Sequence, residues 1–95
     1  MRVRFAPSAA TQFLEALEFI RQDDPRAAAS LLDRVAEATR LLARHPGLGR
    51  RIPESPPSRH RQLVVRPYRF FYRVERDEVV VVGVWHGRQI PREPY

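Results

Sequence analysis

The sequence predicts a two-layer α+β fold in which an N-terminal helical hairpin packs on one face of a mainly antiparallel sheet. Three features support this fold: a short alternating segment at 2–6, two adjacent stretches of helical periodicity within 9–44, and three segments rich in valine and aromatic residues within 61–86. The expected element order is β-α-α-β-β-β. A chain of 95 residues suits one small domain, so residues 1–95 are expected to fold as a unit.

The first half of the chain predicts a strand followed by two helices. Residues 2–6 alternate arginine with apolar side chains, and Ser8 is expected to cap a helix over 9–21. Asp24 and Pro25 suit the start of a second helix that ends near residue 44, and the short link requires an antiparallel hairpin. The expected apolar stripes are Ala10, Phe13, Leu14, Leu17 and Ile20 in the first helix and Ala28, Leu31, Leu32, Val35, Ala38 and Leu42 in the second.

The second half predicts a loop and then three strands. Residues 47–60 are rich in glycine and proline, which favours a loop, and strands are expected at 61–66, 69–75 and 78–86. Two-residue turns at 67–68 and 76–77 would set the register. The resulting cross-strand pairs include Arg66 with Arg69, Phe70 with Gly83, and Arg69 with Val84.

Alternation of side chains sorts this sheet into two faces. One face is apolar and aromatic and is expected to pack on the helices: Leu63, Val65, Phe70, Tyr72, Val74, Val79, Val81, Gly83 and Trp85. The other face mixes arginine and histidine with an apolar patch: Gln62, Val64, Arg66, Arg69, Phe71, Arg73, Val80, Val82, Val84 and His86. A patch of this kind on a small protein indicates a binding partner.

The distribution of charge also indicates an anionic partner. All 17 basic residues are arginine, and residues 50–73 hold seven of them with a single acid, Glu54, for a net charge of +6. Arginine presents a planar fork of donors that suits phosphate and carboxylate groups. The alternative is that these arginines serve only as solvated surface cations.

One corner of the expected sheet has side chains suited to catalysis or anion binding: Arg66, Arg69 and His86. In the expected register His86 is a diagonal neighbour of Arg69 at roughly 7–8 Å, so two guanidinium groups could hold a phosphate while the imidazole moves a proton. Arg88 follows the strand and could join them, and Glu54 could act as a general base. The alternatives are a strand-end histidine bonded to backbone, arginines that contact an acidic partner, and a solvated Glu54.

Composition excludes several other kinds of site. The chain has no cysteine, and its three histidines are far apart, so neither a metal site nor a cofactor is expected. No stretch is apolar enough for a signal peptide or a membrane span, so we expect a cytoplasmic protein without a membrane partner or a small-molecule substrate.

The whole pattern resembles the RelE/ParE superfamily of type II toxin–antitoxin toxins. The resemblance rests on the order of elements and on the segments "HPGLGR", "PE" within a proline-rich loop, "YRFFYRV" and "VWHGR". It covers nearly the full chain. It implies a growth-inhibiting toxin that is neutralised by an antitoxin encoded alongside, and it implies that the N-terminal strand extends the sheet beside the last strand.

The branches of this superfamily differ in their targets. RelE-like members cut mRNA on the ribosome, and Arg69, Arg88 and Tyr95 match their pattern. His86 and Glu54 resemble the acid and base of the YoeB-like branch. The chain departs from that pattern because it has Gln62 and Val64 in place of lysines and Gly87 in place of a tyrosine. ParE-like members inhibit DNA gyrase by binding, and they share the long hairpin and the "HGR" ending. We therefore favour a ParE-like gyrase inhibitor, with an mRNA endonuclease or a degenerate toxin that only binds antitoxin as the alternatives.

The resemblance and the charge pattern together predict an interface. An acidic segment of the antitoxin is expected on the mixed face of the sheet, on the outer groove of the hairpin, or on both. The residues expected to bind the antitoxin or the target are Arg50, Arg51, Arg61, Arg66, Arg69, Phe71 and Arg73. Arg69, His86, Arg88 and Glu54 would be catalytic only in a ribonuclease.

Overall fold

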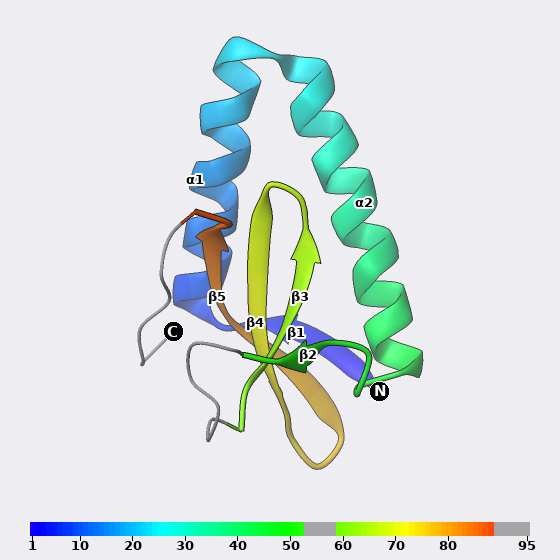
Figure 1. The fold of residues 1–95 in the computed structure, drawn as a ribbon. Coiled ribbons are helices and arrows are strands. Elements are labelled where there is room, and N and C mark those ends of the chain that lie inside the picture. The colour runs from blue at the N-terminus through cyan, green and yellow to red at the C-terminus, as the bar shows by residue number, and fades with distance from the viewer. Residues whose placement is uncertain (53–58, 89–95) are drawn as a thin grey trace.

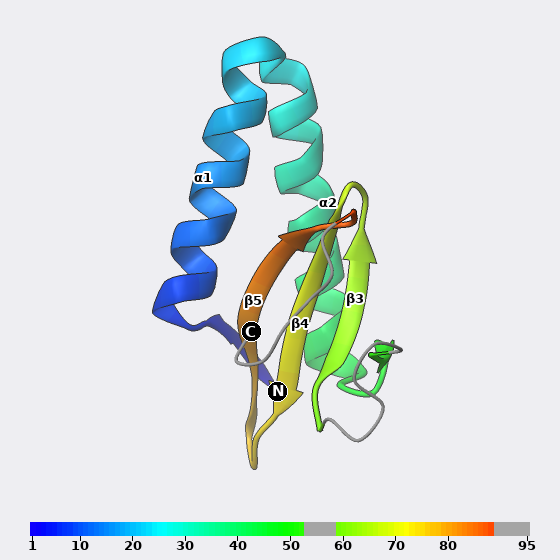
Figure 2. The ribbon, with the colours of Figure 1, turned by 60° about the vertical axis from the view of Figure 1, so that its left-hand side comes forward.

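The computed structural model describes residues 1–52 and 59–88 and contains two helices and five strands (Figure 1). The elements in chain order are β1 (Arg2–Phe5), α1 (Pro7–Asp23), α2 (Pro25–Arg44), β2 (Arg50–Arg51), β3 (Arg61–Val65), β4 (Tyr68–Val74) and β5 (Glu78–His86). They form the expected two-layer α+β fold, with the helical hairpin on one side of the sheet (Figure 2). The tip of the hairpin projects beyond the ends of the strands (Figures 1 and 2).

The sheet has the strand order β1-β5-β4-β3-β2. β1 lies beside β5, as the resemblance implied. It runs parallel to β5, and the other neighbours are antiparallel. β2 lies in a segment that we expected to be only loop, and it adds a short edge by pairing Arg50 with Gln62 and Arg51 with Arg61. Its two exposed arginines have no apolar alternation, so the sequence carried no strand signal there.

The two helices start differently. Asp24 caps α2 as expected, because its Oδ1 accepts from the backbone N–H of Arg26 at 3.1 Å and of Ala27 at 3.2 Å. The expectation for α1 is wrong at its first turn: the helix begins at Pro7, so Ser8 lies inside it and Ala6 is the N-cap, with no side-chain hydrogen bond. Proline is favoured at the first helical position, and here it decides where α1 begins.

Neither helix of the described residues has the length and apolar content that a membrane span requires.

The core lies between the hairpin and the sheet. Phe5, Phe13 and Phe70 meet there, with ring centroids 5.7–6.4 Å apart. The buried members of this core are Ala9, Phe13, Leu31, Val35, Leu42, Val65, Tyr68, Phe70, Tyr72, Val79, Val81 and Val84. Leu14 and Leu32, which we expected on the inner stripes, are 64% and 49% exposed. Each follows a buried residue directly, and a turn of about 100° per residue takes its side chain off the inner face.

The turn between β3 and β4 lies one residue earlier than expected. Val65 pairs with Tyr68, so residues 66 and 67 form the turn and Tyr68 begins β4 with its ring in the core. The expected pair of Arg66 with Arg69 is therefore wrong, and Arg69 pairs with Val64. Because the register has moved by two residues, the other side chains of β3 keep the faces that the sequence predicted.

The pairing of β4 with β5 contains a bulge that changes the expected faces. The register is as predicted from Val74 with Val79 to Tyr72 with Val81, but Phe71 then pairs with Gly83, so Val82 is an extra residue. A shift of one residue inverts the faces of everything that follows. The consequences are that Val84 joins the helix-side core and Trp85 packs on the outer face beside Phe71, both opposite to expectation.

The outer face of the sheet is not the open apolar patch that we expected. Phe71 and Val80 are fully buried, and Ile52 packs against Phe71 with Val82 and Trp85 alongside. Ile52, which directly follows β2, thus covers part of this face. Phe71 is consequently a core residue and not the exposed contact residue that the sequence suggested.

Candidate functional site

A pocket of about 480 Å³ opens where β3, β4 and β5 reach the end of the sheet nearest the β3–β4 turn. We call it the basic pocket because its described lining contains four arginines and a histidine and no aspartate or glutamate. Its lining residues are Arg50, Gln62, Val64, Arg66, Pro67, Arg69, His86, Gly87 and Arg88. Positive charge gathered in a concave surface attracts anions, so the lining of this pocket suits an anionic ligand.

Gln62 and Arg69 form the buried floor of the basic pocket. Gln62 is 1% exposed and Arg69 is 9% exposed. The Nε of Arg69 donates to Oε1 of Gln62 at 2.7 Å, and the guanidinium lies 5.2 Å from the centroid of the Phe71 ring. These contacts hold the guanidinium in place, since an arginine gains both from a planar hydrogen bond and from an aromatic face.

The bond to Arg69 also determines which way the Gln62 amide points. The amide oxygen must face the Arg69 donor, so the amide nitrogen takes no part in that bond and needs a different acceptor. That nitrogen is buried and has no hydrogen-bond partner. A buried donor without an acceptor costs about 1–3 kcal/mol, and the floor of the pocket is thus short of an acceptor.

His86 reaches the pocket from the other side of the sheet. Beyond the bulge it pairs with Tyr68, and the two rings meet edge-on with centroids 5.5 Å apart. Its Nδ1 accepts from the backbone N–H of Arg88 at 3.2 Å. Arg69 pairs with Trp85 on the outer face, so the expected diagonal contact between Arg69 and His86 is wrong. Both residues line the basic pocket, but they reach it from opposite faces of the sheet.

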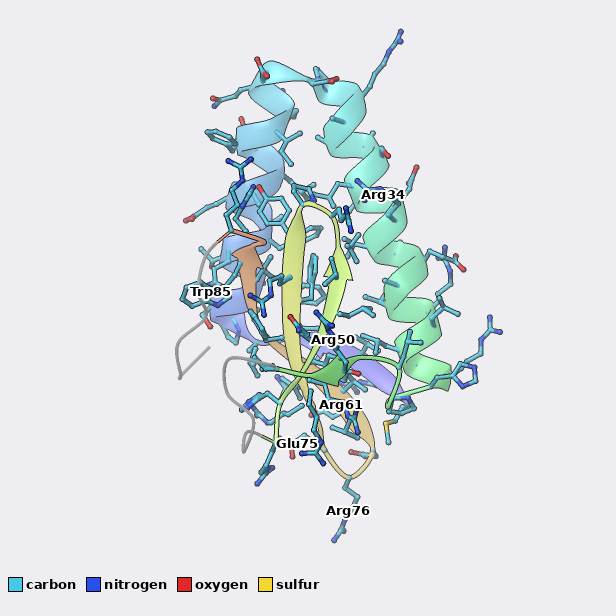
Figure 3. All side chains as sticks on the ribbon, in the orientation of Figure 1. Arg34, Arg50, Arg61, Glu75, Arg76 and Trp85 are labelled. Carbon is cyan, nitrogen blue, oxygen red and sulfur yellow. The ribbon has the colours of Figure 1, made fainter. Side chains whose placement is uncertain are left out.

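The other residues predicted for binding are divided between the two ends of the sheet. Arg50, Arg66 and Arg88 line the basic pocket. Arg61 donates to the backbone oxygen of Gly49 at 2.8 Å, and Arg73 donates to Glu75 Oε1 at 2.6 Å. Figure 3 shows Arg61 and Glu75 at the opposite end from Arg34. Arg51 lies on the exposed edge strand, while Glu54 and Tyr95 lie outside the described residues.

Gln62 is the buried polar residue of this site that sequence reasoning did not select. The only signal was a single amide between charged and apolar residues of a strand, which would ordinarily indicate a solvated position. Its burial depends on β2, which pairs Arg50 with it, and on Gly49. A Cβ on Gly49 would lie 2.5 Å from the Gln62 backbone oxygen, so only glycine allows this close approach. Within the described residues, no group of three or more potential metal ligands is present.

Comparison with known proteins first identifies the fold and then the family. A chain from a solved structure, "Chromosomal ParDE TA system from P. aeruginosa", matches with a TM-score of 0.73 at 18% identity, covering 90% of this chain and 95% of that one. A protein of Sinorhizobium fredii (strain NBRC 101917 / NGR234) named "Putative toxin Y4kP" is 36% identical over 92 residues, which is 93% of this chain and 90% of that protein. Residues 3–91 match the family model for the ParE toxin of the type II toxin–antitoxin system parDE. The chain belongs to this ParE toxin family, and the resemblance noted from its sequence is confirmed.

Proposed function

We propose that this ParE-family toxin stops growth by binding DNA gyrase and that a cognate antitoxin protein neutralises it. The observation that supports binding over catalysis is the bulge in β5. It places His86 against Tyr68 on the helix side of the sheet, while Arg69 is held by Gln62 on the outer side. A general acid or base must lie within hydrogen-bond reach of the proton it transfers, at the phosphate that the arginine holds.

The hairpin offers a surface that suits a protein target. Phe19 is 76% exposed, and Leu14 and Leu32 are also exposed on the two helices. Large apolar side chains exposed on a projecting element suit contact with another protein. The hairpin tip, which projects beyond the sheet, can reach a large protein without obstruction by the strands (Figure 1).

An mRNA endonuclease is the second candidate. The specific observation that favours it is that Arg69, His86 and Arg88 line one pocket, even though they reach it from different sides. In that case His86 would transfer a proton at a phosphate bound by the arginines.

Substitution of His86 distinguishes the two functions. General acid–base catalysis contributes about 10²–10⁴-fold, so His86→Gln should nearly abolish mRNA cleavage in an endonuclease and leave the toxicity of a gyrase inhibitor intact. The matched control is His45→Gln, an exposed histidine that follows α2. Growth is measured without antitoxin at equal expression, and supercoiling by purified gyrase is measured with the wild-type toxin. Loss of toxicity in a folded His86→Gln protein, together with unaffected gyrase, would reject our proposal.

A further inference from the structure

An apolar groove lies beside the basic pocket, between α2 and β3. It has a volume of about 430 Å³, and its surface is mostly aliphatic. The lining residues are Arg34, Glu37, Ala38, Leu41, Leu48, Leu63, Val64, Val65 and Arg66. Leu41, Leu48 and Val64 are each at least 38% exposed, so the groove leaves three large apolar side chains in contact with water.

The groove and the basic pocket adjoin each other along β3. Val64 and Arg66 line both of them. The relative position of their walls is fixed by Arg34 of α2, whose Nη1 donates to the backbone oxygen of Arg66 at 2.8 Å. Among the described residues, β2 pairs with β3 only at Arg61 and Gln62, so the outer edge of β3 beside the groove has no strand partner. An open edge of this kind can accept main-chain hydrogen bonds from a bound segment.

The floor of the basic pocket needs an acceptor. The Gln62 amide nitrogen is buried without one, and the described rim adds arginines but no acidic side chain. A carboxylate has only acceptor oxygens and bonds strongly to guanidinium groups. Because the amide nitrogen is enclosed, contact with a carboxylate requires the side chains around it to move.

We propose that one segment of the antitoxin occupies both sites, with apolar side chains in the groove and one aspartate or glutamate carboxylate on the Gln62–Arg69 floor. This inference rests on the proposed antitoxin partner. A protein segment fits better than RNA because the described lining of the groove is aliphatic, whereas single-stranded nucleic acid is bound by stacking on aromatic rings. The single segment explains why an apolar groove adjoins a pocket of cations.

The test measures the dissociation constant of the purified toxin for the antitoxin by calorimetry. Val64→Asp puts a like charge beside the incoming carboxylate, and Arg66→Glu reverses the charge where the two sites meet. Each is expected to weaken binding on the order of tenfold or more. Both positions are exposed, so the melting temperature should stay near that of the wild type.

Arg76→Glu is the matched control for charge. Arg76 is exposed in the turn between β4 and β5 and projects away from the sheet at the end far from Arg34 (Figure 3). Its substitution makes the same change in net charge as Arg66→Glu, and binding should change by no more than about twofold. An antitoxin acid-to-arginine substitution that restores binding to Arg66→Glu would identify the carboxylate.

Three other outcomes would overturn the inference, and the binding measurements distinguish them from one another. If the wild type binds antitoxin and the Val64 and Arg66 variants bind as tightly, the segment lies elsewhere and the proposed function stands. If no antitoxin binds the wild type, the proposed partner fails with the inference. If a single-stranded RNA oligonucleotide displaces the antitoxin and Arg66→Glu abolishes RNA binding, the pocket takes phosphate, and the carboxylate assignment is wrong.

Discussion

The two faces of the sheet are built from the same strands but differ in what they bury. The helix-covered face is a continuous apolar core that joins both helices to β1, β3, β4 and β5. On the outer face the apolar cluster is small: Ile52 and Phe71 are buried, with Val82 and Trp85 partly buried against them. Beside it lie the two buried polar residues of the described chain, Gln62 and Arg69. Apolar burial is therefore concentrated on one face, and the buried polar side chains lie on the other.

Substitution of two neighbouring phenylalanines on β4 tests this division with the largest expected loss of stability. Both side chains are buried, but on opposite faces of the sheet. Phe70 packs against Phe5 and Phe13 on the helix side, and Phe71 lies on the outer face beneath Arg69. Phe70→Ala should cost about 3–5 kcal/mol of unfolding free energy, and Phe71→Ala should lie at the lower end of that range because its cluster is smaller. Urea denaturation measures both.

Affinity for the antitoxin should also distinguish these two variants. Phe71→Ala removes the ring that supports the Arg69 guanidinium, so the folded variant should bind antitoxin more weakly than Phe70→Ala does. The division of roles would be wrong if Phe71→Ala retained wild-type affinity while Phe70→Ala lost it, with both compared at concentrations of urea where each is folded.

Tyr72 connects the two regions and provides a test of intermediate size. Its ring belongs to the helix-side core, while its hydroxyl accepts from the Gly49 N–H and donates to the Pro46 oxygen, both at 2.8 Å. These bonds hold the segment that leads into β2. Tyr72→Phe leaves both backbone groups without this partner and should cost about 1–3 kcal/mol of unfolding free energy at neutral pH.

The same substitution predicts a change in alkaline stability. Burial raises the pKa of Tyr72 above its ordinary value of 10.0, against smaller lowering effects from the Gly49 N–H and the Arg61 charge. A raised folded pKa means that the contribution is complete below pH 10 and is lost as pH rises through the folded value. The difference in stability between wild type and Tyr72→Phe should therefore shrink above pH 10 in urea titrations. A constant difference would mean that the hydroxyl is not the titrating group.

Most of the fold could be predicted because its signals are local and redundant. Asp24 and Pro25 mark the hairpin turn, and apolar side chains at helical spacing mark the buried faces. The bulge could not be predicted, because residues 79–82 are four consecutive valines and a shift of one residue leaves a valine on either face. The site depended on that shift. It moved His86 and Trp85 to the opposite faces, and no pattern in the sequence indicated that β2 would bury Gln62.

The smallest expected effect concerns the hairpin tip, which projects beyond the ends of the strands (Figure 1). Asp24→Ala removes the side chain that caps α2 and should lower the free energy of unfolding by about 0.5–2 kcal/mol. Asp23→Ala is the matched control, because it removes an exposed carboxylate from the preceding position without removing a cap, and it should change stability by less than about 0.5 kcal/mol. Since Asp24 does not line the basic pocket, the Asp24 variant should bind antitoxin segments at that pocket as tightly as the wild type. Hydrogen exchange should show the loss of protection confined to the first turn of α2, and loss spread through the sheet would mean that the tip and the two faces unfold as one cooperative unit.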